Sequence, residues 1–192
     1  MKKLGIAAAL AVLSVLAVAS FAFATGGDGG GGSFHAKMNG YNEVPSISTA
    51  GRGNFQALVR FEDDQIRYKL TYSGLEGGNV LFAHIHLAQE HVNGAVVAFL
   101  CGGGTKGACP ASGTVTGTIG AGDVVAVPAQ GIAAGEISEV VRAMRRGAIY
   151  ANVHTDTYRG GEVRGQVERG HKAKRGPEDD DRYEERGEGR RK

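Results

Sequence analysis

The sequence predicts an all-β domain, an antiparallel β-sandwich or barrel-like domain with one short helix, flanked by a signal peptide and a disordered charged tail. The first observation is a two-residue periodicity along 55–61 and 66–72, in which apolar residues recur at every second position, the pattern of strands that bury one face. The second is the recurrence of short segments of this kind between glycine-rich turns. Short strands at such spacing are typical of antiparallel sandwiches and barrels.

The two alternating segments are expected to pair as an antiparallel hairpin. The polar residues Glu62, Asp63 and Asp64 lie between them and make a turn of hairpin length. Six more segments have the composition of strands and are bounded by turn residues. They are 34–39, 80–86, 95–100, Gly113–Ile119, 148–154 and 162–167. The sequence therefore predicts seven to nine strands in all.

One helix is expected near the end of the domain, at Ile137–Arg145. Its apolar residues recur at helical spacing, acidic residues stand in its first turn, and basic residues stand in its last turn. Gly147 follows as a stop signal. We expect this helix to lie across one end of the sandwich or barrel.

The two termini differ from the domain in composition. Lys2 and Lys3, a long apolar run and the ending Ala22-Phe23-Ala24 indicate a secretory signal peptide at 1–24. The alternative is an uncleaved membrane anchor, since the run is about as long as the ~20 residues that span a bilayer. A glycine-rich linker at 25–32, a single β domain at 33–168 and a disordered charged tail at 169–192 complete the predicted organisation. The mature protein is expected to be secreted, periplasmic or attached to the cell surface, with no membrane span after cleavage.

The charge balance excludes one class of partner. Without Lys2 and Lys3, the 22 Lys and Arg residues become 20, which equals the 20 Asp and Glu residues. A balanced charge offers no basic surface of the kind that binds nucleic acid. The acidic and basic blocks of the tail are typical of a solvated segment, with weak adhesion to a charged cell surface as the alternative.

Cys101 and Cys109 flank a glycine-rich loop. An even, closely spaced pair in an exported protein predicts a disulfide, which would hold this loop in place. A thiolate metal site is the alternative, but it would need a second cysteine pair and a reducing compartment.

Histidines in two distant segments are the strongest chemical signal. His84 and His86 are two residues apart on a predicted strand, so their side chains point to one face, and His154 lies on another predicted strand. Neutral imidazoles from adjacent strands are suitable ligands for copper or zinc, and binding would weaken as the pH falls through about 6.5. The alternative is that these histidines are hydrogen-bonded within the sheet or exposed on its polar face. The residues offered as outer partners of the ligands are Asn152, Thr155 and Glu162.

Several motifs then follow one another along nearly the whole predicted domain, from about 34 to 167. They are Asn42-Glu43-Val44-Pro45, Gly51-Arg52-Gly53, Ile66-Arg67-Tyr68-Lys69-Leu70, Ser73-Gly74-Leu75, Ala83-His84-Ile85-His86, Val92-Asn93-Gly94-Ala95-Val96-Val97, Tyr150-Ala151-Asn152-Val153-His154-Thr155 and Gly160-Gly161-Glu162-Val163-Arg164-Gly165-Gln166. In this order the chain resembles the chordin-type (CHRD) domain family, in its small exported bacterial form. Within these motifs, Glu43, Pro45, Arg164 and Gln166 are singled out as family-motif positions.

The resemblance implies an extracellular β-rich domain and leaves three functional hypotheses. Animal chordin carries copies of this domain beside growth-factor-binding modules, and a chain with one copy and no such modules does not inherit that role. The first hypothesis is a module that binds copper or zinc. The second is an interaction module for an unknown protein or cell-surface partner, without metal or catalytic chemistry. The third is a copper oxidoreductase similar to superoxide dismutase. The further ligands of that enzyme class, which include a metal-bridging histidine, are not visible in this sequence, so enzymatic activity is not favoured.

Overall fold

The computed structural model describes residues 31–60 and 65–170. Within these residues the chain forms nine strands, one α-helix and three short 3-10 helices. The strands are β1 (Gly32–Asn39), β2 (Arg52–Arg60), β3 (Gln65–Ser73), β4 (Val80–Leu87), β5 (Ala95–Cys101), β6 (Gly113–Ile119), β7 (Ile149–Thr155), β8 (Val163–Gln166) and β9 (Glu168–Arg169). The helices are α1 (Ile137–Arg145), η1 (Gly40–Asn42), η2 (Ala121–Asp123) and η3 (Pro128–Gln130).

The expected signal peptide, most of the expected linker, the polar turn at 62–64 and the tail from 171 onward lie outside the described residues. At the two margins, strands extend into segments that the sequence assigned to the linker and the tail. Gly32 is the first residue of β1, and Arg169 in β9 pairs with Phe34 of β1.

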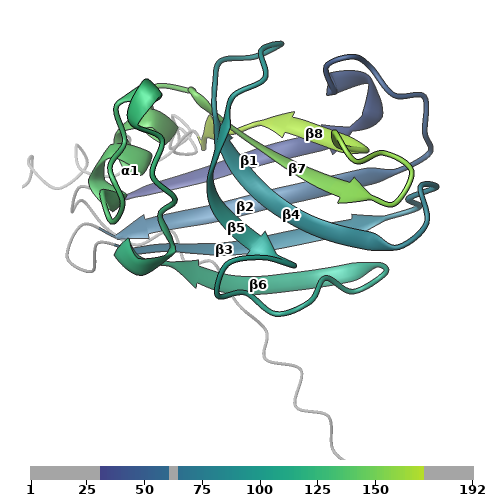
Figure 1. The fold of residues 1–192 in the computed structure, drawn as a ribbon, viewed down its shortest axis with the longest axis horizontal. Coiled ribbons are helices and arrows are strands. Elements are labelled where there is room, and N and C mark those ends of the chain that lie inside the picture. Colours follow the sequence, from purple (N-terminus) through teal and green to yellow (C-terminus); the bar gives the residue numbers. More distant parts are fainter. Residues whose placement is uncertain (1–30, 61–64, 171–192) are drawn as a thin grey trace, which may run out of the picture.

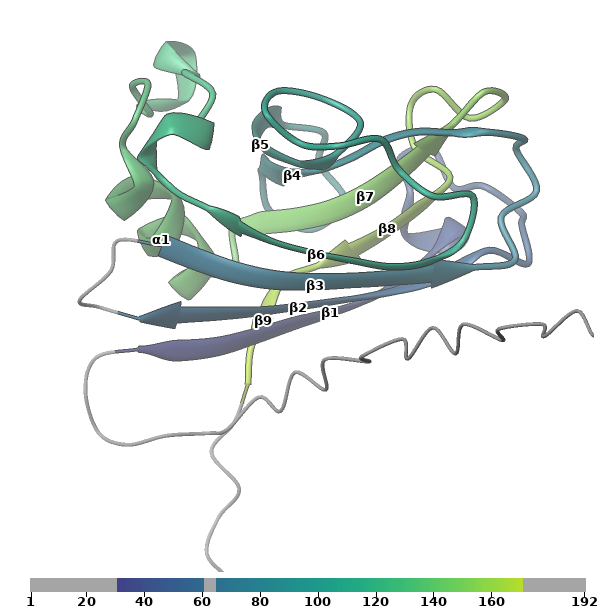
Figure 2. The same ribbon diagram turned by 90° about the horizontal axis from the view of Figure 1, so that it is seen from below.

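The strands form one antiparallel sheet that curls into a nearly closed barrel. Their order is β5-β4-β7-β8-β1-β2-β3-β6, with β9 paired beside β1. Figures 1 and 2 show β1, β2 and β3 along one wall and β4, β5, β7 and β8 along the wall opposite. The all-β prediction is confirmed, in its barrel form, and one short helix is present within the described residues at the expected positions.

A hydrogen bond and a disulfide link β5, at one end of this order, to β3 and to the loop before β6 near the other end. The Tyr68 hydroxyl on β3 donates a hydrogen bond to the Leu100 carbonyl on β5, with an oxygen–oxygen distance of 2.6 Å. A disulfide joins Cys101, the last residue of β5, to Cys109 in the loop that leads to β6. The predicted disulfide is therefore confirmed.

The inside of the barrel is the apolar core, and the two-residue alternation explains it. On the β2–β3 hairpin, Phe55 and Leu70 face each other in the register and are fully buried. Helix α1 lies at one end of the barrel in both views (Figures 1 and 2). It buries one face, formed by Ile137, Val140, Val141 and Met144.

The outer face of β7 departs from the usual pattern of an antiparallel sheet. Such sheets commonly leave one face exposed to solvent, and the outward residues of β2 are mostly exposed in this way. In β7, by contrast, every residue is buried. The residues on its outer face include Asn152 and His154, so this covered face buries polar groups. These polar groups require partners, and they form the candidate site.

Candidate metal centre

The register between β4 and β7 brings the three predicted histidines to one face. Phe82 on β4 stands opposite His154 on β7, and His84 stands opposite Asn152. His86, two residues after His84, points to the same side. The intervening residues of both strands, which include Ile85, turn inward to the core.

The three imidazole rings form a compact cluster. The ring centroids lie 4.3 Å apart for His84 and His154, 4.5 Å for His84 and His86, and 6.4 Å for His86 and His154. One nitrogen from each ring can be chosen so that the three atoms lie within 4.8 Å of one another. Three nitrogens around one metal at about 2.0–2.1 Å would be about 3.5 Å apart, so nitrogens at the 4.8 Å limit would have to approach each other by about 1.3 Å to share an ion.

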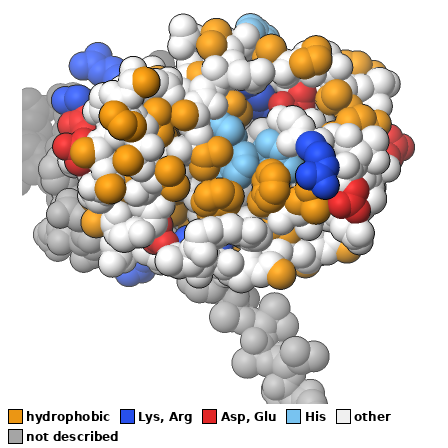
Figure 3. Space-filling model, in the orientation of Figure 1, with side chains coloured by type: hydrophobic (Ala, Val, Ile, Leu, Met, Phe, Trp, Pro, Cys, Tyr) orange, Lys and Arg blue, Asp and Glu red, His pale blue; other side chains and the backbone are white. Residues whose placement is uncertain are grey.

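The cluster is buried but lies close beneath the surface. The exposed fractions are 4% for His84, 8% for His86 and 5% for His154. In the space-filling view, histidine atoms are visible near the middle of the face that β4 and β5 cross, among hydrophobic side chains (Figure 3). An ion could therefore reach these rings from solvent without passing through the core.

Backbone carbonyls hold two of the rings by the Nδ1 atom. His86 Nδ1 lies 2.9 Å from the Gly94 carbonyl oxygen, and His154 Nδ1 lies 2.7 Å from the Arg159 carbonyl oxygen. Because a carbonyl only accepts, each Nδ1 carries the hydrogen and each neutral ring then keeps its lone pair on Nε2. A carbonyl partner for the second nitrogen is one of the usual arrangements around a metal-binding histidine.

Gly94 can occupy its position only because it has no side chain. A Cβ there would lie 1.9 Å from the Leu87 carbonyl oxygen. This close approach is what lets the loop after β4 bring a carbonyl to His86.

Two ring nitrogens of the cluster are buried and have no hydrogen-bond partner, namely His84 Nδ1 and His154 Nε2. A buried polar atom without a partner costs free energy, roughly 1–3 kcal/mol, so it requires an explanation. A metal ion that accepts both lone pairs would satisfy them.

Asn152 is the outer partner that the sequence identified and that does contact a ring. Its side-chain oxygen Oδ1 lies 3.1 Å from His86 Nε2. With the His86 hydrogen on Nδ1, both of these atoms are acceptors, so the amide satisfies Nε2 only when it is turned to present its NH2 group to the ring. Asn152 thus covers the nitrogen that a metal would use and must turn aside when the ion binds.

Burial keeps the histidines neutral. It lowers the pKa of His84 to about 2 and that of His86 to about 4, and it also lowers the pKa of His154. Mutual repulsion among the rings adds to the effect on His84 and His86. Because the folded protein resists protonation of these rings, the lowered pKa values favour an onset of proton competition for a metal below pH 6.5.

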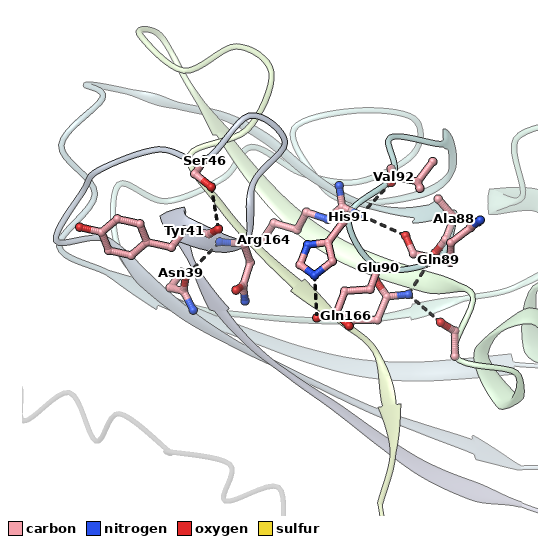
Figure 4. A network of polar contacts seen from close by, with 12 residues as sticks. Asn39, Tyr41, Ser46, Ala88, Gln89, Glu90, His91, Val92, Arg164 and Gln166 are labelled. Carbon is pink, nitrogen blue, oxygen red and sulfur yellow. Dashed lines mark hydrogen bonds and ion pairs between the residues drawn. The ribbon is translucent and has the colours of Figure 1, made fainter.

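A stack of three groups supports the cluster from one side. The Tyr150 ring lies parallel to His86, at 4.5 Å between centroids and 5° between planes, and the Arg164 guanidinium lies 3.4 Å from the Tyr150 centroid. Arg164 also donates to the carbonyls of Val92 and Gln89 and to the Asn93 side chain. Figure 4 shows this side chain reaching from β8 to the loop after β4. Arg164 therefore connects that loop to the ring stack.

Glu43 lies beside the same network, in the segment after η1. Desolvation raises the pKa of its carboxyl to about 7, although the Arg164 charge and contact with Asn152 act in the opposite direction. Its Oε1 atom is buried without a hydrogen-bond partner. Gly161 makes room for it, since a Cβ at that position would lie 2.3 Å from Oε1.

Thr155 and Glu162, which the sequence offered as outer partners of the ligands, bind each other instead. The Thr155 hydroxyl donates to Glu162 at 2.8 Å. The fully buried carboxylate also accepts from the Thr49 hydroxyl and from the backbone N–H groups of Glu76 and Gly77. These hydrogen bonds to Glu162 connect three loops at one end of the barrel.

The other two family-motif positions lie near the loops. The Gln166 amide on β8 donates to the Ala88 and Gly147 carbonyls, at 3.0 and 2.6 Å, and so ties two loops together (Figure 4). Pro45 is exposed on the segment after η1.

Sequence reasoning missed the carbonyls of Gly94 and Arg159 as partners of the histidine rings, because a backbone group has no residue-type signal.

The disulfide indicates an oxidising, extracytoplasmic location. Among the described residues, no helix combines the length and the apolar character needed to cross a membrane.

A family model described as the CHRD domain matches residues 34–167. No curated protein and no solved structure matches the chain.

Proposed function

The chain belongs to the CHRD domain family, and we propose that it is an exported module that binds one copper or zinc ion through His84, His86 and His154. The observation that supports the proposal most is the convergence of three buried, neutral imidazoles, each of which offers one nitrogen within 4.8 Å of the others. Imidazole nitrogen is a good donor for both metals.

The hydrogen-bond pattern favours metal binding over a purely structural role. Histidines that only stabilise a sheet are expected to have their ring nitrogens satisfied. In this cluster His84 Nδ1 and His154 Nε2 have no partner, and the bond of His154 Nδ1 to the Arg159 carbonyl leaves the lone pair of the ring on Nε2. A structural role for the trio would leave both of these unpaired atoms unexplained.

Two independent features support export. The N-terminal segment at 1–24 has the composition of a signal peptide, and the disulfide between Cys101 and Cys109 requires an oxidising compartment. In a secreted, periplasmic or cell-surface location the site would meet metal ions supplied by the environment.

Metal binding is tested with untagged protein exported by its own signal peptide. The purified protein is stripped with a chelator, equilibrated by dialysis with copper or zinc, and analysed for bound metal. We expect about one equivalent to be retained. His84→Ala or His154→Ala should weaken binding by more than about 100-fold, because loss of a ligand costs more than the 10–100-fold typical of an outer partner.

His35→Ala is the matched control, since His35 is a half-exposed strand histidine outside the cluster. It should bind metal like the wild type, and circular dichroism should show the same β-sheet spectrum for all variants. Wild-type protein that retains no more metal than a variant lacking all three cluster histidines would refute the proposal and leave the interaction module as the better hypothesis.

A further inference from the structure

The number and arrangement of donors restrict the ion. Within the described part of the chain, the cluster that could hold a metal consists of His84, His86 and His154, and no carboxylate or thiolate belongs to it. Cu(II) prefers four ligands in a square-planar or tetragonal set and Zn(II) four in a tetrahedral set, so with these three rings either divalent ion needs a water as its fourth ligand. A three-coordinate ion fits this set without a further protein ligand.

The surroundings of the rings restrict the charge of the ion. The Nδ1 atoms of His86 and His154 donate to neutral carbonyls, so no carboxylate offsets a cation through either ring. Aromatic rings of Phe82 and Phe99 pack against His84. The cost of transferring an ion from water into such a site rises with the square of its charge, and it is therefore about four times larger for a divalent ion.

A nearby positive charge adds to this preference. The spacings of 3.4 and 4.5 Å in the stack place the Arg164 guanidinium about 8 Å from the centre of the His86 ring. At that distance and an effective dielectric constant of about 20, repulsion of a second unit of charge lowers affinity by roughly 30-fold. The carboxyl groups that act on Arg164, on Glu43 and Glu90, do not belong to the group of side chains that could hold the metal.

We infer that the three-histidine site selects monovalent copper, Cu(I), over Zn(II) and Cu(II). The inference rests on the proposed function, because it names the ion that the same three residues hold. Cu(I) carries one charge and accepts nitrogen donors at low coordination number, so it meets both restrictions. The ion is taken up as Cu(I), and binding transfers no electron.

The inference is tested by measuring affinities for the three ions on untagged metal-free protein. Cu(I) is titrated without oxygen against bathocuproine disulfonate, and Zn(II) and Cu(II) are titrated against chromophoric chelators of matched strength. We expect one equivalent of Cu(I) to bind at least about 30-fold more tightly than Zn(II), the factor set by the guanidinium alone.

Asn152→Asp places a negative charge beside His86 and should shift the preference toward the divalent ions by at least about 30-fold, because a carboxylate attracts a double charge twice as strongly. Asn54→Asp on the exposed face of β2 adds the same charge away from the cluster, and it should leave the ratio unchanged. If Asn152→Asp fails to fold, the wild-type ratio decides alone.

Zn(II) or Cu(II) bound as tightly as Cu(I) would overturn this inference and leave the proposed metal-binding function standing. Binding of none of the three ions would overturn both. A preference for Cu(I) that Asn152→Asp leaves unchanged, in a folded variant, would show that charge does not set the selectivity and would overturn the electrostatic basis of the inference.

Discussion

Acidification should destabilise the metal-free protein, because its clustered histidines are held neutral. Burial lowers the pKa of His84 to about 2 and of His86 to about 4, and lowers the pKa of His154 as well. An unfolded histidine has a pKa near 6.5, so the unfolded chain takes up protons first as the pH falls. The stabilising contribution of the cluster is therefore complete above about pH 6.5 and is lost progressively as the pH falls toward the folded-state values.

The size of the effect follows from the pKa difference. At pH 5 an unfolded histidine is protonated and the folded His84 and His86 are not, which costs about 2 kcal/mol of unfolding free energy for each residue. Together they remove about 4 kcal/mol between pH 7 and pH 5, and His154 acts in the same direction.

Glu43 opposes this loss. Burial raises the pKa of its carboxyl from 4.5 to about 7, so the folded state prefers the protonated form. A carboxyl with a raised folded-state pKa contributes stability at low pH that is lost as the pH rises toward 7. Acidification from pH 7 to pH 5 therefore returns about 2 kcal/mol, and the wild type should lose about 2 kcal/mol plus the share of His154.

The assay is urea unfolding at pH 7 and pH 5 in the presence of EDTA, with the disulfide intact. Glu43→Gln should lose more stability on acidification than the wild type, by about 2 kcal/mol, since the opposing group is gone. A variant with His84, His86 and His154 all replaced by Gln keeps Glu43 and should therefore gain about 2 kcal/mol on the same acidification. The reasoning is refuted if this triple variant and the wild type lose the same free energy of unfolding between the two pH values.

Two further predictions concern stability. Glu162→Gln turns an amide NH2 toward a set of hydrogen-bond donors and should lower the free energy of unfolding by about 3 kcal/mol. The control Glu168→Gln, at an exposed position, should change it by less than about 0.5 kcal/mol. Equal changes for the two variants in urea unfolding would contradict a stabilising role of the hydrogen bonds to Glu162. Cys101 and Cys109 are separated by eight positions, and replacing both by Ser should lower the free energy of unfolding by about 2.5 kcal/mol. A thermal or urea unfolding curve that matches the wild type would show that the disulfide does not constrain the unfolded chain.

Local patterns predicted the elements of the fold well. The alternation along β2 and β3 identified both strands to within three residues of their observed ends, and the helical spacing of apolar residues identified α1. The choice between sandwich and barrel remained open, because it depends on which strands meet at the edges. The Tyr68 hydroxyl bond to Leu100 belongs to those edges, and no local pattern reports it.

The face shared by the histidines was also predictable, since side chains alternate along a strand and His84 and His86 are two residues apart. Their distance to His154 was not predictable, because it depends on the register of β4 against β7, two strands more than sixty residues apart in the chain. The burial of the cluster depended on the loops after β4 and β7, which bring the carbonyls of Gly94 and Arg159 over the rings.

The sequence by itself determined the strand and helix segments, the cysteine pair, the family resemblance and the identity of the candidate ligands, because each of these is encoded in short-range patterns of residue type. Only the tertiary structure decided that the outer face of β7 is covered, that two ring nitrogens are left without partners, and that Arg164 stacks on Tyr150 beside His86. Burial and pKa depend on what distant segments pack over a residue, and that information is set by long-range contacts.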